Sequence, residues 1–293
     1  MKTFLKFILL FFLSFALSRA FIWITPGDPV EILISEMGYK ESPEALSQAL
    51  GLQSGYFESL YYRFIDLLHG NFGLTLLTQE PILPILFSAT IKTTLLTVLS
   101  MGFAFLWVLT AFLLLAFTPK IRPLFEWFIA VEWSLPTLLV GPILLLLFSV
   151  IFPIFEPAGS PILPALALSI SIAAYWIRIS MTLLSSPQSK EYIRSAQARG
   201  CGEFHALLKY GLAPHMGALT PQIMSQWGAL MTGAFIVEAI FEYPGLGSVY
   251  LKAILQRDYL VFESVLFWNI TLVLLFHWMG ELWSTYVDPR LRS

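Results

Sequence analysis

Charged residues are scarce in this chain. Asp, Glu, Lys and Arg make up 12% of its 293 residues, whereas apolar residues make up 57% and the mean hydropathy is +0.75. A soluble globular domain carries about 25% charged residues, so the composition excludes that class and indicates an integral membrane protein. The net charge of −2 gives no basic footprint for a nucleic acid.

Cysteine and catalytic motifs are also nearly absent. Cys201 is the only cysteine, which excludes an internal disulfide. The sequence has no G-x-x-x-x-G-K-[ST] phosphate loop, no G-x-S-x-G and no H-E-x-x-H. We therefore expect that the chain does not hydrolyse ATP itself, and no catalytic or metal-ligating residue is predicted. An intramembrane enzyme stays an alternative that lacks a candidate nucleophile.

Long apolar runs are what the chain has in abundance. A helix needs about 20 mostly apolar residues to cross the hydrocarbon core, and six stretches qualify: about Phe4–Ile24, Thr90–Phe117, Phe125–Phe152, Ile162–Leu184, Leu219–Phe241 and Phe262–Tyr286. Because they lack the alternation of barrel strands, we expect an all-α protein with six transmembrane helices. A cleaved signal peptide is the alternative for the first run, but Arg19 interrupts the Ser18-Arg19-Ala20 sequence that resembles a cleavage site.

Basic residues predict the orientation, because Lys and Arg concentrate in cytosolic loops. With the N-terminus inside, most of the seventeen lie in the cytosol: Lys2, Lys6, Lys120, Arg122, Arg178, Lys190, Arg194, Arg199, Lys209, Arg290 and Arg292. The other six lie outside: Arg19, Lys40, Arg63, Lys92, Lys252 and Arg257. Both termini are therefore predicted to be cytosolic. Residues 1–89 would form the first span and an external segment, and residues 90–293 a five-helix core.

The external segment is expected to contain two short helices. The sequence predicts them over Pro43–Leu50 and Tyr56–Leu68, separated by Gly51 and Gly55. In the second helix, apolar residues recur at the spacing of one helix face. They are Phe57, Leu60, Tyr61, Phe64 and Leu68. We interpret this stripe as local packing and not as a binding face.

One long polar stretch, Ser186–His215, interrupts the apolar runs. Its first pair, Ser186-Pro187, suits the N-cap and first position of a helix that we expect to reach Arg199, where Gly200 ends it in the left-handed conformation. A second helix is expected over Glu203–Gly211, with its acid in the first turn, where the helix dipole favours it. A polar, basic helical pair has good reason to dock on a cytosolic partner. An ordinary solvated loop explains the composition equally well.

Three motifs in this half of the chain resemble one family. Residues 191–200, EYIRSAQARG, resemble the "EAA" coupling loop of bacterial ABC importer permeases, in the "EYIRTARAKG" form of the oligopeptide/dipeptide and nickel subfamily. Residues 237–247, VEAIFEYPGLG, resemble the subfamily's "VETIFxxPGLG", and residues 257–259 its "RDY". The resemblance extends over essentially the whole chain. In one departure, the Glu-Ala-Ala positions hold Arg194, Ser195 and Ala196.

This resemblance to the binding-protein-dependent transport permeases implies a function and a set of partners. It implies a multi-pass subunit of the bacterial inner membrane that forms the pathway for oligo- or dipeptides, with nickel or another small solute as the alternative. A second, related permease would pair with it in the lipid bilayer. Two cytosolic ABC ATPase subunits would supply the ATP-Mg chemistry, and an external binding protein would deliver the substrate. No cofactor is expected in this chain.

The resemblance also implies which residues meet these partners. The ATPases would contact the coupling loop at Glu191, Tyr192, Arg194, Ser195, Ala196, Arg199 and Gly200. The external binding protein would dock near Pro244, Gly245, Gly247, Arg257, Asp258 and Tyr259. A local salt bridge or helix cap is the alternative for the Arg-Asp pair. The resemblance assigns no substrate-binding residue.

Charge inside a predicted span carries a further expectation. A charge at the bilayer centre costs about 2.5–3.5 kcal/mol, so Glu238 in the fifth span should face protein or water. A structural partner and substrate contact explain this residue equally well. A secondary transporter that works alone would show internal repeats or paired charges within its spans, and we find neither in the sequence.

Overall fold

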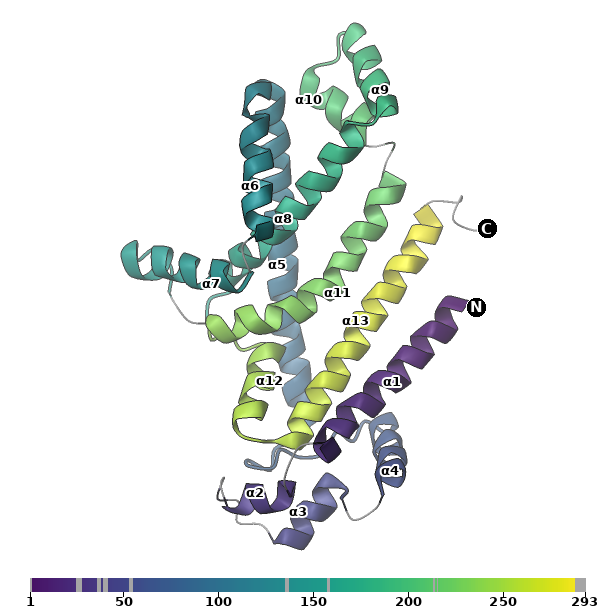
Figure 1. Cartoon of the computed structure of the whole chain (residues 1–293), viewed down its shortest axis with the longest axis vertical. Coiled ribbons are helices and arrows are strands. Elements are labelled where there is room, and N and C mark those ends of the chain that lie inside the picture. Colours follow the sequence, from purple (N-terminus) through teal and green to yellow (C-terminus); the bar gives the residue numbers. More distant parts are fainter. Residues whose placement is uncertain are drawn as a thin grey trace. The chain divides into compact units, whose positions relative to one another are not determined.

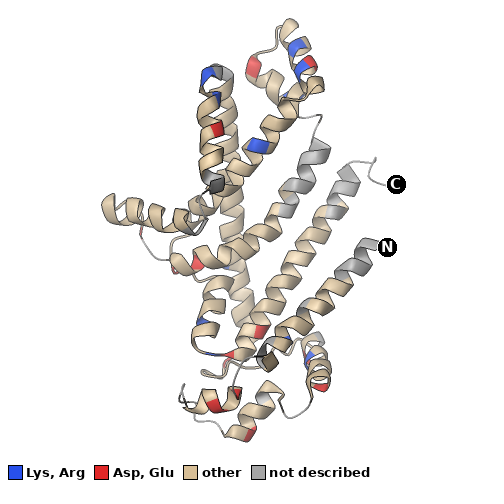
Figure 2. Cartoon of the chain, viewed as in Figure 1, with Lys and Arg blue, Asp and Glu red and all other residues tan. Residues whose placement is uncertain are grey.

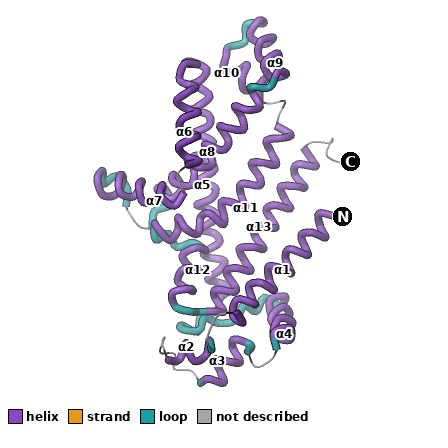
Figure 3. The backbone as a smooth tube through the Cα atoms, in the orientation of Figure 1, coloured by secondary structure: helices purple, strands orange, loops and turns teal. Residues whose placement is uncertain are grey.

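Helices account for nearly all of the regular structure in this computed structural model of the protein. It describes residues 2–24, 28–35, 38, 42–52, 55–134, 137–156, 159–212, 214 and 216–287. Within these ranges the chain forms helices and no β-strand, apart from an isolated antiparallel bridge between Leu74 and Pro81 (Figure 3). The all-α prediction is confirmed for the part of the chain that is described.

The helices divide into two compact units (Figure 1). Unit 1 comprises residues 1–93 and 244–278, and unit 2 comprises residues 94–243 and 279–293. The helices of unit 1 are α1 (Lys2–Ile24), α2 (Pro29–Ser35), α3 (Pro43–Leu50), α4 (Tyr56–Leu68) and α12 (Leu246–Leu255). Those of unit 2 are η1 (Pro119–Ile121), α6 (Arg122–Ser134), α7 (Thr137–Leu145), η2 (Leu146–Ile151), α8 (Ile162–Leu184), α9 (Pro187–Ala198), α10 (Glu203–His205), η3 (Ala206–Leu212) and α11 (Met216–Ile240). Two long helices, α5 (Ile82–Phe117) and α13 (Tyr259–Val287), contribute to both units.

Three helices in the described residues are long and apolar enough to cross a membrane. These stretches are Ile82–Leu115, Ile162–Leu184 and Tyr259–Gly280. They coincide with the second, fourth and sixth predicted spans, and α1 and α11 cover the first and the fifth. The helix bounds predicted for α3 and α4 in the external segment are confirmed. The total of six spans stays a prediction.

The third apolar run does not form a single helix. α6 ends at Ser134, and α7 begins at Thr137 and passes into the π-helix η2. Figure 1 shows α6 and α7 running in different directions, so the span predicted over about Phe125–Phe152, in which Pro136 and Pro142 are candidates for a kink, consists of two separate helices. A proline disfavours the helical conformation of the residue before it, and Pro136, which lies outside the described residues, falls at this break.

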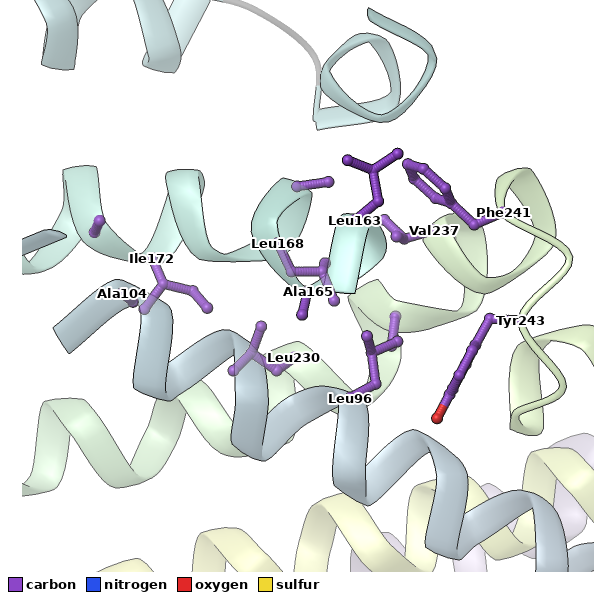
Figure 4. Packing of buried hydrophobic residues seen from close by; sticks show 13 residues of the cluster. Leu96, Ala104, Leu163, Ala165, Leu168, Ile172, Leu230, Val237, Phe241 and Tyr243 are labelled. Atoms are coloured by element: carbon purple, nitrogen blue, oxygen red, sulfur yellow. The ribbon is translucent and has the colours of Figure 1, made fainter. Parts of the chain in front are cut away.

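Small side chains allow the helices of unit 2 to approach closely. Its core joins α5, α8 and α11 around a cluster of buried apolar residues (Figure 4). Along one face of α8, Ala165, Ser169 and Ala173 recur every four residues and are at most 2% exposed. On α7, a Cβ atom at Gly141 would lie 3.3 Å from a ring carbon of Phe241. Such small residues are typical of helix contacts within membranes.

A buried cluster of charges joins four helices of unit 1. Nη1 of Arg19 on α1 lies 2.8 Å from Oε2 of Glu263 on α13, and both side chains are at most 2% exposed. The same guanidinium donates hydrogen bonds to Ser59 Oγ on α4 and to the carbonyl of Leu50, the last residue of α3. Nε of Arg63 on α4 lies 3.8 Å from the other carboxylate oxygen of Glu263. The first and last long helices of the chain are thus linked by opposite charges.

Removing one partner of this cluster is expected to destabilise unit 1 strongly. Glu263→Ala would leave Arg19 buried without its counter-charge, a change that costs about 3–5 kcal/mol. The matched control is Glu126→Ala, because Glu126 forms a 3.0 Å ion pair with Arg122 in which the two side chains are 57% and 55% exposed. Exposed pairs are worth about 0–1 kcal/mol. Thermal unfolding in detergent compares the two variants, and equal decreases in Tm would contradict the central role of the buried pair.

Candidate functional site

The polar loop begins with a capped helix. α9 spans Pro187–Ala198, and Ser186 adopts the extended conformation of an N-cap with φ of −62° and ψ of 146°. Its Oγ accepts a hydrogen bond from the N–H of Ser189 over 3.3 Å, which satisfies one of the free donors of the first turn. The predicted N-cap and proline start are confirmed.

A glycine turn ends α9. Gly200 has a φ of +84°, and its N–H donates to the carbonyl of Gln197 over 2.9 Å. The N–H of Cys201 donates to the carbonyl of Ala196 over 3.1 Å. These two hydrogen bonds define a Schellman motif, in which a left-handed residue reverses the chain. The predicted role of Gly200 as the helix stop is confirmed.

The second helical segment packs against the first. It starts at α10 and continues as the π-helix η3, so the helix expected over Glu203–Gly211 is present but is mostly π-helical. His215, where we expect the loop to end, lies outside the described residues. A Cβ atom at Gly211 would lie 2.5 Å from Cδ2 of Leu184 on α8 and 3.0 Å from Cδ1 of Ile193 on α9. The missing side chain of Gly211 therefore lets η3 lie directly on both helices.

Most residues of the predicted coupling loop are accessible on α9 and its turn. Glu191, Tyr192, Arg194, Ser195, Arg199 and Gly200 are exposed, with Tyr192 at 45%. Ala196 is the exception, because it is fully buried and so contributes to packing. Figure 2 shows the basic residues on α9. The guanidinium of Arg199 also lies 5.5 Å from the ring centroid of Tyr210 in η3, a cation–π distance.

The proline-glycine motif attaches α12 to α5 within unit 1. Leu246 begins α12, and its N–H donates to Oγ1 of the buried Thr93 over 2.8 Å. Gly245 is the extended N-cap residue of α12. Gly245 and Gly247 are buried, whereas Pro244 is exposed. The motif therefore positions the helix, and of residues 244–247 only the proline is exposed.

Asp258 of the Arg257-Asp258-Tyr259 motif caps α13. Its Oδ1 accepts from the N–H of Val261 over 3.1 Å, and its Oδ2 accepts from the N–H of Leu76 over 2.8 Å. The side chain is 3% exposed. Burial raises the pKa of this carboxyl above its ordinary value, and the hydrogen bonds from the backbone oppose that rise. This geometry matches the capping alternative. Of its neighbours, Tyr259 is buried and Arg257 is partly exposed, with a φ of +50°.

Sequence reasoning missed the charge cluster of unit 1. Arg19 served as an argument against signal-peptide cleavage, both Arg19 and Arg63 were counted as external bases, and Glu263 was not singled out. A usable signal was present, since a charge that interrupts an apolar run indicates a partner inside the protein. Glu238, which we expected to face protein or water, is fully buried in α11.

An all-helical chain with membrane-length apolar helices and an exposed polar loop between two of them is typical of a transport permease. Residues 108–293 match the family described as "Binding-protein-dependent transport system inner membrane component". Since this match covers more than half of its length, the chain belongs to that family. It is a multi-pass protein of the inner membrane and the permease subunit of an ABC importer.

Among known proteins, the chain is similar to glutathione transport system permease protein GsiC. The relative from Escherichia coli strain K12 is 27% identical over 280 residues, which cover 93% of this chain and 91% of the relative. The same identity and coverage hold for the relatives from Shigella dysenteriae serotype 1 and Shigella flexneri serotype 5b. The likeness therefore extends beyond the family match to nearly the whole chain.

Loss of the Asp258 carboxylate is expected to weaken the start of α13. Asp258→Ala leaves two buried N–H groups without acceptors, and each costs about 1–3 kcal/mol. Arg257→Ala is the control, because it keeps both hydrogen bonds of Asp258. Position 257 already has a positive φ with a non-glycine residue, so alanine adds no new backbone strain there. Thermal unfolding and limited proteolysis near Leu76 measure the effect. If Asp258→Ala has wild-type stability but the binding protein no longer stimulates the ATPase activity of the importer, a docking role is favoured over a capping role.

Proposed function

We propose that this chain and a second, related permease together form the pathway by which small peptides enter the cell. The family supplies the importer function, and the relatives named above favour the peptide class, since glutathione is itself a small peptide. This favours peptides over nickel. An external binding protein would deliver the substrate, and the exposed residues around α12 are the candidate docking region on this chain.

The exposed face of α9 is the proposed contact for one of the two cytosolic ATPases, which would hydrolyse ATP-Mg. The observation that carries this proposal is a polar helix that follows α8 closely and is packed against η3. α9 follows α8 after two residues, and η3 packs on both α8 and α9 at Gly211. A force on α9 would therefore be transmitted to α8, which shares its core with α5 and α11. Rigid, packed elements move as bodies, so closure of the ATPases would tilt these helices together.

Substrate class is tested in proteoliposomes that contain the complete importer and its own binding protein. Uptake of a labelled dipeptide or tripeptide should require ATP on the side of the membrane where the ATPase subunits lie. Unlabelled peptides and glutathione should compete with it, whereas nickel ions and nickel chelates should not. Uptake of nickel without competition by peptides would contradict the peptide proposal and leave the importer assignment intact.

Cysteine labelling tests the proposed cytosolic position of the loop. Cys201 is partly exposed, so a membrane-impermeant thiol reagent should leave it unmodified in spheroplasts and modify it in inside-out vesicles. The control is Cys201→Ser combined with Glu58→Cys, which places one thiol on the exposed surface of α4 and should give the opposite pattern. The proposed orientation has both termini in the cytosol. Labelling of Cys201 from outside would overturn it.

Gly200→Asp tests the coupling role. A side chain at a φ of +84° costs about 1 kcal/mol or more, but no atom lies within 4 Å of a Cβ atom at Gly200. The chain should therefore insert in the membrane at normal levels. The ATPases should be missing from the purified complex, and peptide uptake should be lost. Gly202→Asp is the control, because Gly202 has an ordinary φ of −59° and equal space. Wild-type uptake by Gly200→Asp with ATPases bound would overturn the coupling-loop assignment.

A further inference from the structure

The apolar stripe on α4 is only partly used for packing. Phe64 packs against α1, with its ring centroid 5.1 Å from that of Phe12 and 5.7 Å from that of Phe15. Phe57 and Tyr61 lie on the same stripe, yet they are 82% and 63% exposed. The interpretation of the whole stripe as local packing is therefore wrong for these two aromatic residues. They need a different explanation.

α4 presents three different surfaces. Ser59 and Arg63 face the charge cluster and are largely buried. The exposed aromatic pair forms a second surface, because residues four apart lie on one helix face. Glu58 and Asp66 lie on a third, exposed side of the helix, with Tyr62, which is 60% exposed, between them. A helix with a buried side, an apolar side and a partly charged side is suited to a boundary between lipid and water.

α4 lies alongside the outer half of α1 and not beyond its end. The hydroxyl of Tyr56 donates to the carbonyl of Ala16 over 2.7 Å, and Phe64 contacts Phe12 as described above. α1 ends at Ile24. At a rise of about 1.5 Å per residue, Ala16 lies about 12 Å and Phe12 about 18 Å along the axis from that end. With α1 as a membrane span, these contacts place α4 below the outer membrane surface.

An exposed apolar side of α1 borders this contact. Leu9, Leu13 and Leu17 recur every four residues and are 67%, 52% and 62% exposed. Ala16, which accepts the hydrogen bond from α4, is a helical neighbour of Leu13. The exposed aromatic residues of α4 therefore continue an apolar surface that α1 also exposes. Within a membrane span, such a surface is the side that lipid chains can cover.

From this geometry we propose that α4 is embedded in the outer leaflet, with Phe57 and Tyr61 among the lipid chains and Glu58 in water. The ring of Tyr56, close to Glu58, lies 6.2 Å from that of Trp23, which is next to the last residue of α1, so this part of α4 is near the membrane surface. The proposal rests on the proposed topology, in which α1 spans the membrane. Glu58 offers no attraction to anionic lipids, so the aromatic side chains supply the binding. The first external segment is then partly a membrane element, which anchors the helices that surround the Arg19–Glu263 pair.

Spin-label accessibility tests the proposal on the full importer complex in lipid nanodiscs. Cys201→Ser removes the single thiol of this chain, and the cysteines of the partner subunits are also replaced. Phe57→Cys, Tyr61→Cys and Glu58→Cys are then introduced one at a time. Labels at Phe57 and Tyr61 should be more accessible to oxygen than to a water-soluble nickel complex. The label at Glu58, one residue from Phe57, should show the reverse ratio. Neither ratio should change when anionic phosphatidylglycerol replaces part of the zwitterionic lipid.

Two outcomes would overturn the proposal. Greater accessibility to nickel than to oxygen at Phe57 and Tyr61 would place both in water. Low accessibility to both reagents in the complex, with high nickel accessibility in the isolated chain, would show that a partner protein covers the face. The Cys201 labelling experiment separates either result from a wrong topology, because it reports the orientation of the loop independently of α4.

Discussion

The buried pair of Arg19 and Glu263 is the constraint on which unit 1 depends. These residues are separated by 244 positions in the chain, and each lies in a long apolar helix where an unpaired charge is strongly unfavourable. Because Arg19 also bonds to Ser59 and to the carbonyl of Leu50, the pair determines where α3 and α4 pack as well. The lipid-facing position proposed for α4 is a consequence of this arrangement.

In unit 2, the main structural feature is the close packing of a polar loop against apolar helices. Its core uses small residues on α8 where unit 1 uses charge. The loop is attached to that core by Gly211, whose missing side chain lets η3 touch Leu184. Close contact transmits displacement because packed interiors have little free space. The capped α9 can therefore act as a rigid extension of α8, as the coupling proposal requires.

Local chemistry made several elements predictable. The bounds of α3 and α4, the Ser186 cap and the left-handed Gly200 all depend on residues within one or two turns, where propensity and capping act. Pro136 and Pro142 indicated a kink in the third apolar run, but the complete break between α6 and α7 was not predicted, because an apolar run of sufficient length indicates a span whether or not the helix is continuous. The burial of Asp258 was also not predicted, since its second donor, Leu76, is distant in sequence.

The sequence by itself determined that this is an all-helical membrane protein, where its polar loop begins and turns, and which transport family it resembles. These properties follow from composition, local capping and linear motifs. Only the tertiary structure decided that Arg19 and Glu263 are partners, that Ala196 and Asp258 are buried, and that Phe57 and Tyr61 are exposed. Burial and charge pairing depend on which distant helices meet, and a helical stripe looks the same in sequence whether protein or lipid covers it.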